Sequence, residues 1–165
     1  MYYIFLENEK LNGAGQCPVI NEEVENLEVS EDVYNAYCET PEKFVYKDGE
    51  IVKNPNYEEE QKQKERARLD NLSMTRGDVF EALILAKGLG KAQIRAMIEQ
   101  ASLDDITKAL YLNRFDEALE FYRGYPIFDM LGQALNITGE MLDKFFETKD
   151  YKELIAKDES TSTDS

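Results

Sequence analysis

The stretch KFVYKDGEIVKNPNYEEEQKQKERAR, residues 43–68, decides the architecture of this chain. Its first part predicts a β-hairpin whose strands are Lys43–Tyr46 and Glu50–Lys53. The connecting Asp48-Gly49 suits a type I′ turn, because both residues tolerate the positive φ that this turn needs. The hairpin predicts that the chain up to this point forms a small β-containing head.

The second part of the stretch changes character at Asn54-Pro55, which ends the strand. A run of Glu, Gln, Lys and Arg then predicts an exposed helix from about Tyr57 to Leu72. Pairs such as Glu58 and Lys62, four residues apart, support it by about 0.3 kcal/mol each. We interpret this charged helix as a spacer, because the apolar positions of a coiled coil are missing.

Upstream of the hairpin, the aromatic and β-branched run Tyr2–Leu6 predicts an opening strand. Asn12-Gly13, with Gly15, has turn chemistry, and Cys17–Ile20 is predicted to return as the partner strand. Ser30 is expected to cap a short helix that ends at Thr40-Pro41. The head is thus predicted to hold two hairpins and one helix.

Downstream of Ser73 the sequence predicts a series of short amphipathic helices with N-terminal signals at Thr75, Gly90, Ser102, Pro126 and Thr138. One of these helices is predicted over the segment FDEALEFYRG and the last one continues through KDYKEL. The residues expected to face the core at helical spacing are Val79, Phe80, Leu83, Ile84, Ala86, Ile94, Met97, Ile98, Ile106, Leu110, Leu112, Phe115, Leu119, Tyr122, Ile127, Met130, Leu131, Leu135, Met141, Leu142, Phe145 and Phe146.

These elements predict an α+β protein: a small β-hairpin head joined by a charged helix to a compact bundle of short α-helices. The expected boundaries are 1–56 for the head, 57–73 for the linker helix and 74–156 for the bundle. The tail, 157–165, lacks apolar residues and is expected to be disordered.

Composition argues against an enzyme. The chain has no histidine, so the commonest general base and metal ligand are missing. We expect neither a cofactor nor a metal site. The acids Glu22, Glu23 and Glu25 and the pair Asp104-Asp105 lack the spacing of a calcium loop. The two cysteines, Cys17 and Cys38, are expected to be free thiols, buried or half-buried.

The formal net charge is −15, and residues 1–57 carry 12 acidic and 4 basic side chains. This balance argues against direct nucleic-acid binding, because phosphate backbones require a positive patch. The segment Asp78–Gln100 has the order of a helix-turn-helix, but Lys91 and Arg95 are the cations of its second helix. The segments Arg76–Asp78 and Gly88–Lys91 are read as helix ends rather than as an integrin motif and a phosphate loop.

Aromatic residues crowd the head, and two interpretations stay open for them. Most are expected in its core, because a small β module needs large side chains for burial. Some could instead form a docking patch, since tyrosine is favoured at interfaces. The candidate partner-binding residues are Tyr2, Tyr3, Tyr34, Tyr37 and Tyr46.

The order of elements resembles small phage and prophage proteins encoded beside tail-fibre genes. The resemblance rests on the opening strand, on Val29–Tyr34, on the hairpin Phe44–Val52 and on the stop Asn54-Pro55 before a charged helix. Tail-fibre assembly chaperones and tail-accessory proteins share this layout. The chaperones commonly carry a Pro-rich linker where this chain has the charged helix. The part from LSMTRGDVFEALILAKG to FFETKDYKEL resembles an uncharacterised helical domain of prophage proteins from Gram-positive anaerobes.

The resemblance implies a non-enzymatic, tail-associated structural or assembly protein whose partner is a phage tail-fibre or baseplate protein. The alternative is an acidic phage inhibitor of a host defence nuclease, of the anti-CRISPR or anti-restriction type. No signal peptide or membrane span is predicted, so we expect a soluble protein in the host bacterial cytoplasm during assembly, or in the virion tail. An exposed hairpin edge could also build a homo-oligomer.

Overall fold

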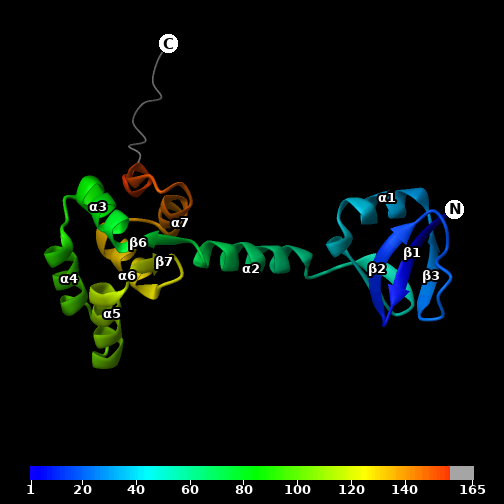
Figure 1. Cartoon of the computed structure of the whole chain (residues 1–165), viewed down its shortest axis with the longest axis horizontal. Helices are drawn as coiled ribbons and strands as arrows, with labels where there is room; N and C mark the ends of the chain where they lie inside the picture. The colour runs from blue at the N-terminus through cyan, green and yellow to red at the C-terminus, as the bar shows by residue number, and fades with distance from the viewer. Residues whose placement is uncertain (157–165) are drawn as a thin grey trace, which may run out of the picture. The chain divides into compact units, whose positions relative to one another are not determined.

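The computed structural model describes residues 1–156, and the tail predicted to be disordered lies outside them. The chain divides into two compact units, Met1–Gln63 and Lys64–Ser165 (Figure 1). The N-terminal unit is rich in β-structure and the C-terminal unit is mainly helical, so the fold is α+β as the sequence predicts.

The N-terminal unit contains two antiparallel sheets and a helix. The first sheet has the strand order β2-β1-β3, and the second is the hairpin β4-β5. The elements are β1 (Tyr2–Glu7), β2 (Lys10–Gly15), β3 (Val24–Val29), α1 (Glu31–Glu39), a 3-10 turn (Pro41–Lys43), β4 (Phe44–Lys47), β5 (Glu50–Lys53) and the start of α2 (Tyr57–Asp70).

The predicted hairpin and the α1 cap are confirmed. Asp48 and Gly49 have φ of 54° and 89°, which closes the β4-β5 turn in the left-handed region. The Ser30 hydroxyl accepts a hydrogen bond from the Val33 amide at 3.4 Å, and Thr40 ends the helix. The conformational preferences and hydrogen bonds of neighbouring residues therefore decide the β4-β5 turn and the two ends of α1.

The predicted first hairpin is wrong in the position of its turn and of its second strand. The chain turns at Asn8 and Glu9, with φ of 51° and 61°, so β2 already begins at Lys10 and Cys17–Ile20 is not a strand. Gly13 and Gly15 lie inside β2 because the Phe5 ring lies over them: a Cβ at Gly15 would come 2.9 Å from Phe5 Cζ. These glycines make room for a ring rather than a turn.

Strand β3, which the sequence pattern does not predict, forms the other neighbour of β1. Ile4 and Leu6 on β1 are buried, and Leu27 on β3 pairs with Ile4 on the same face of the sheet. Helix α1 lies against β1 and β2 and contributes Tyr37, which is 4% exposed (Figure 1). The core of this unit is therefore a sheet face closed by one helix.

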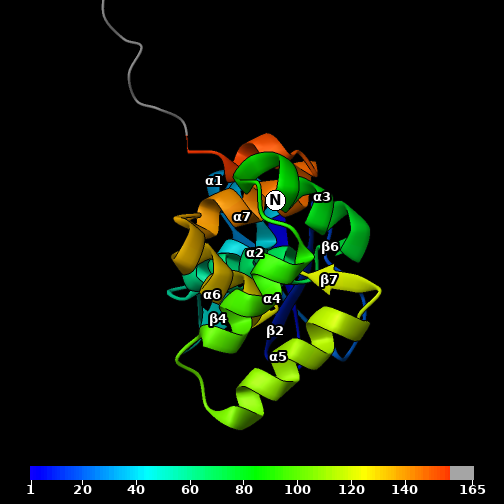
Figure 2. The same cartoon turned by 90° about the vertical axis from the view of Figure 1, so that its left-hand side faces the viewer.

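The C-terminal unit is a helical bundle with one short two-stranded sheet, β6-β7 (Figure 2). After the end of α2 its elements are β6 (Ser73–Thr75), α3 (Arg76–Lys87), α4 (Lys91–Gln100), α5 (Asp105–Glu117), β7 (Glu120–Tyr122), α6 (Pro126–Leu135), α7 (Gly139–Thr148) and a 3-10 turn (Tyr151–Leu154). The predicted signals at Thr75, Gly90, Pro126 and Thr138 each stand at the start of a helix.

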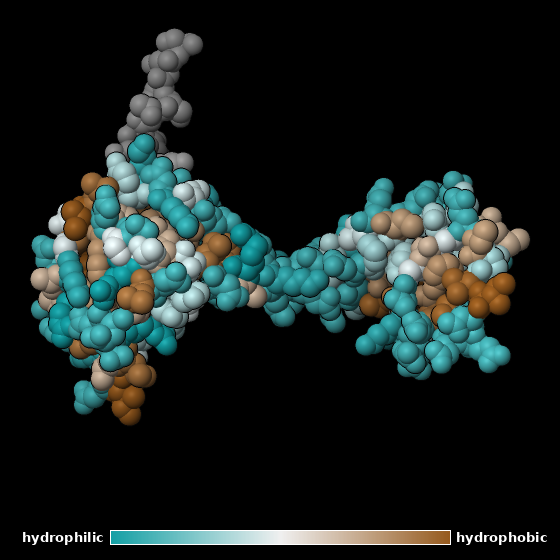
Figure 3. Space-filling model, viewed as in Figure 1, coloured by the Kyte–Doolittle hydropathy of each residue, from teal (hydrophilic) through white to brown (hydrophobic). Residues whose placement is uncertain are grey.

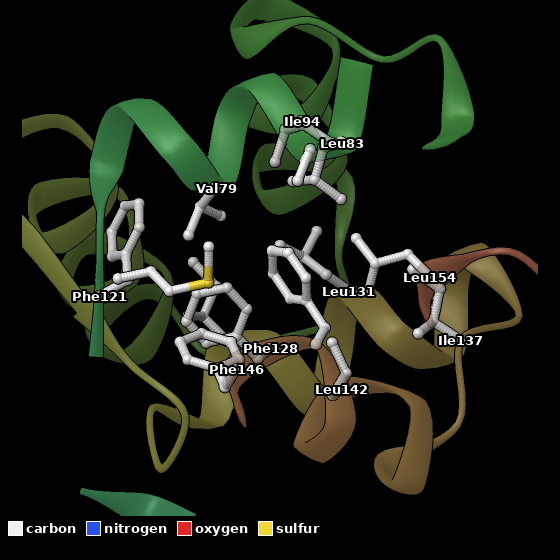
Figure 4. Close-up of a cluster of buried hydrophobic side chains, with 14 of the residues drawn as sticks. Val79, Leu83, Ile94, Phe121, Phe128, Leu131, Ile137, Leu142, Phe146 and Leu154 are labelled. Carbon is white, nitrogen blue, oxygen red and sulfur yellow. The ribbon is translucent and has the colours of Figure 1, made fainter. Parts of the chain in front are cut away.

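Aromatic rings in edge-to-face contact run through the core of this unit (Figure 4). The Phe128 ring lies 5.7 Å from that of Phe121 and 5.0 Å from that of Phe146, which in turn lies 5.5 Å from Phe145. These contacts connect β7, α6 and α7. Aliphatic side chains from α3 and α4, among them Val79, Leu83 and Ile94, complete the core.

The region between α5 and α6 differs from the prediction. Asp104, not Ser102, caps α5, and its carboxylate accepts a hydrogen bond from the Thr107 amide at 2.9 Å. The segment predicted as a separate helix divides instead between the end of α5 and β7. Tertiary pairing decides this: β7 joins β6, and the Arg76 amide donates to the Leu119 carbonyl at 3.0 Å.

Four residues predicted to be core are exposed, and the last helix is shorter than predicted. The exposed fractions are 51% for Ile84, 75% for Ile106, 64% for Leu110 and 81% for Leu119. Ile84, Ile106 and Leu110 lie on helices that are apolar on more than one side, of which the structure buries only one, and Leu119 lies between α5 and β7. Helix α7 ends at Thr148, because Lys149 has φ of 59° and turns the chain into the final 3-10 turn.

Gly132 on α6 provides a test of the packing between α6 and α7. A Cβ at this position would lie 2.7 Å from the Ile137 carbonyl oxygen and 3.1 Å from Leu142 Cδ1. We expect Gly132→Ala to lower the free energy of unfolding by about 1–3 kcal/mol, although alanine is the better helix former. Urea unfolding followed by circular dichroism measures this change, and Gln133→Ala on the exposed side of α6 is the control, because it introduces alanine into the same helix without a core contact. A Gly132→Ala protein as stable as the wild type would contradict the contact.

Candidate partner-binding surfaces

The five candidate tyrosines do not form one surface. Tyr2 on β1 and Tyr34 on α1 are half-buried, and their rings lie 4.9 Å apart. A hydrogen bond to the Glu31 side chain raises the pKa of Tyr2, and one to Cys38 raises the pKa of Tyr34. These phenols stay neutral at physiological pH and act as packed aromatic groups.

The other three candidates lie in different surroundings. Tyr37 belongs to the core. Its pKa is raised because burial outweighs the hydrogen bond with the Gly13 backbone, which lowers the pKa. Tyr46 is half-buried and lines a cavity of about 420 Å³ together with Tyr37. Tyr3 points to the opposite face of β1 from Tyr2, and its hydroxyl donates to the Met1 sulfur at 2.7 Å. A partner-binding role for them stays a prediction.

The outer edge of β3 offers backbone groups for pairing. The Val24 amide donates to the Asn21 carbonyl at 3.2 Å, so it points away from β1. Hydrogen-bonding direction alternates along an antiparallel strand, and the amides and carbonyls of Asn26 and Glu28 therefore also point away from β1. Within residues 1–156, no hydrogen bond to these four backbone groups is found.

A groove of about 460 Å³ lies beside this edge. Its walls come from β3, the start of α1 and the β4-β5 turn. The apolar lining residues Leu27, Val29, Val33 and Ile51 are all half-buried, so the groove has an apolar floor that water still reaches. The full lining is Asn26, Leu27, Glu28, Val29, Ser30, Val33, Gly49, Glu50 and Ile51.

The charge of the groove is negative. Glu28 and Glu50 are its charged lining residues, and both are exposed. Glu25 also lies on β3, and Glu31 and Asp32 open α1. A ligand in this groove would therefore gain from positive charge near its apolar contacts.

Sequence reasoning missed this groove because it missed β3. Acidic residues interrupt the apolar pattern of VENLEV, so the strand shows little alternation. Leu27 and Val29, two residues apart after turn-forming positions, were the available signal.

The C-terminal unit has two further surfaces with apolar residues. A groove of about 350 Å³ runs along α3, where Asp78, Glu81 and Leu85 face Lys149 and Tyr151. Ile106 and Leu110 lie one turn apart on the outer side of α5. Figure 2 shows α5 at the margin of this unit, and Figure 3 shows apolar atoms gathered at the end of that helix.

The one buried charged side chain found in the described part of the chain is Arg123, which is 3% exposed. Its guanidinium donates to Asp143 at 2.6 Å and to Asp129 at 3.0 Å. Arg66 on α2 also donates to Asp143, at 3.0 Å and 3.1 Å, and to Asp70. Each charge has its partner, so this cluster joins the C-terminal end of α2 to α7 within the C-terminal unit rather than presenting a reactive group.

Residues 1–156 hold no group of three or more potential metal ligands. Glu22, Glu23, Glu25, Asp104 and Asp105 therefore form no such group. Asp104 is a helix cap, and its hydrogen bonds to Thr107 lower its pKa. Cys17 and Cys38 are free but exposed, which corrects the prediction that they are buried or half-buried. Among the described helices, none is both long and apolar enough to cross a bilayer.

Comparison with known proteins gives one family match. Residues 24–61 match a family described as a protein of unknown function, DUF2977. Comparison with curated proteins and with solved structures finds no match. The matched stretch runs from β3 to the first part of α2 and contains every residue that lines the β3 groove.

Proposed function

We propose that this chain is a non-enzymatic, tail-associated protein of a phage or prophage that acts through protein–protein contacts. The phage context rests on two resemblances: that of the N-terminal elements to phage and prophage proteins encoded beside tail-fibre genes, and that of the helical part to an uncharacterised domain of prophage proteins. The proposed partner is a tail-fibre or baseplate protein. The observation that carries the interaction role is the open edge of β3 beside an apolar groove.

Three features of the molecule support binding over chemistry. The chain has no histidine, so an acid-base site would have to come from other groups. The buried charge of Arg123 is paired with the carboxylates of Asp143 and Asp129. Apolar side chains are exposed in both units, at Ile20 in the N-terminal unit and on α5 in the C-terminal unit. Exposed apolar patches are typical of interaction surfaces.

The experiment is affinity capture with the tagged full-length chain from a lysate of an induced lysogen, followed by mass spectrometry. We expect enrichment of tail-fibre or baseplate proteins over a lysate from the uninduced strain. Enrichment of a host nuclease or another defence complex would overturn the tail role and favour the acidic-inhibitor alternative. Capture of unrelated proteins alone would count against both.

A further inference from the structure

The β3 edge has the geometry of a site for strand addition. A strand has pairing groups on both sides, and only the β1 side of β3 is used from Asn26 to Val29. An added strand would lie about 4.8 Å from β3 and bond to the outward groups of Asn26 and Glu28. A helix cannot satisfy this row of donors and acceptors, because its own backbone groups are already paired, so the edge favours an extended segment.

The two faces of β3 then set which side chains such a peptide needs. Leu27 and Val29 point to the face that carries α1, where Val33 and Ile51 complete the groove. Peptide residues opposite Leu27 and Val29 enter this groove and should be apolar. Glu28 lines the groove from the edge of the sheet, and its side chain projects from the opposite face to those of Leu27 and Val29, so the peptide residue opposite it should be Lys or Arg.

Charge argues against a second copy of this chain as the occupant. Strand β3 carries Glu25 and Glu28 and has no basic residue. Pairing of β3 with its own copy would bring four carboxylates into one ladder, beside Glu50 at the groove. A basic partner strand instead pairs its cations with these groups.

From these observations we propose that the β3 groove binds an extended segment of a partner protein, in which apolar residues alternate with Lys or Arg, as a fourth strand of the β2-β1-β3 sheet. The inference rests on the proposed function in that it takes the partner to be a protein, and it names the kind of segment that binds. Every residue in the argument lies in the stretch that matches the family of unknown function.

The test uses the full-length chain and two synthetic probes. The first is a blocked nine-residue peptide that alternates Val and Lys, and the second has Glu at each Lys position. We expect the Lys probe to bind and the Glu probe to bind at least tenfold more weakly. Amide hydrogen exchange of Asn26 and Glu28 should slow at least tenfold with the Lys probe, because both amides become paired. No binding of the Lys probe at 1 mM, or binding without slower exchange at these amides, would overturn the proposal.

Variants separate backbone pairing from charge. E28P removes an outward amide without removing a bond to β1, which an edge strand tolerates, and should weaken binding of the Lys probe at least tenfold. E28Q keeps the amide and should weaken binding about threefold at low salt, with a smaller effect at high salt. E23Q removes the same charge outside the groove and should change affinity less than twofold. V33R is the substitute if E28P does not fold. Its long side chain blocks the groove and should also weaken binding of the Lys probe at least tenfold.

The same variants distinguish this inference from the proposed function. If the wild type captures tail proteins from the lysate and folded E28P captures them equally, the tail role stands and strand addition is overturned. If neither captures tail proteins, the proposed function fails, and the peptide experiment decides strand addition by itself. Loss of tail proteins with E28P but not with E23Q supports both.

Discussion

Replacing Phe146 with alanine is expected to lower the free energy of unfolding of the C-terminal unit by about 3–5 kcal/mol, the largest effect among these substitutions. Phe146 is 1% exposed and lies in ring contact with both Phe128 and Phe145. Its removal leaves a cavity where α6 and α7 meet and also takes away two edge-to-face contacts. An effect of this size would lower the unfolding midpoint by well over 10 °C, since each kcal/mol is worth about 4–8 °C for a domain of this size.

The measurement is urea and thermal unfolding of the full-length chain, followed by circular dichroism at the helix band. Phe146→Leu keeps much of the volume and should cost less than about 1.5 kcal/mol, so it gives a graded result if the alanine variant does not fold. Leu110→Ala is the control, because that side chain is 64% exposed. A Phe146→Ala protein no less stable than Leu110→Ala would contradict the placement of this ring in the core.

The second large effect is expected at Arg123. Replacing it with methionine, which has a similar length and no charge, should lower the free energy of unfolding by about 3 kcal/mol. The loss comes mainly from Asp143, whose side chain is only 19% exposed and loses the shorter of its ion pairs. Arg66 still contacts Asp143 after the substitution, which keeps the loss at the lower end of the range for a broken buried pair.

Asp129 supplies the matched control for Arg123. Its carboxylate contacts the same guanidinium at 3.0 Å, but its side chain is 59% exposed. Asp129→Asn should therefore change stability by less than about 1 kcal/mol. Chemical denaturation of both variants makes the comparison. Equal losses from Arg123→Met and Asp129→Asn would mean that burial of the cluster does not set its contribution.

The groove beside β3 shows where sequence reasoning reached its limit. The sequence predicts the hairpin of Lys43–Tyr46 and Glu50–Lys53 and Ser30 as the cap that starts α1, so two of the three walls follow from local signals. The third wall, β3, has an acidic pattern that contains no clear alternation. It becomes a strand because Ile4 and Leu6 of β1 need a neighbour on each side, and that requirement is visible only when the sheet is assembled.

The same contrast holds in the C-terminal unit. Helix starts at Thr75 and Thr138 follow from a hydroxyl that accepts a hydrogen bond from an amide three residues on, and this contact is local. The choice of buried face on α5 is not local. Ile106 and Leu110 are as apolar as Leu112 and Phe115, and only packing against the rest of the bundle decides which pair is covered.

The amino-acid sequence by itself determined the α+β class, the position of the charged helix, the β4-β5 turn and most helix ends. Each depends on the conformational preferences of a few neighbouring residues or on composition. The tertiary structure decided the partners of β1, the pairing of β6 with β7, the buried face of α5 and the open edge of β3. These depend on contacts between residues far apart in the chain, where burial and backbone pairing outweigh local preference.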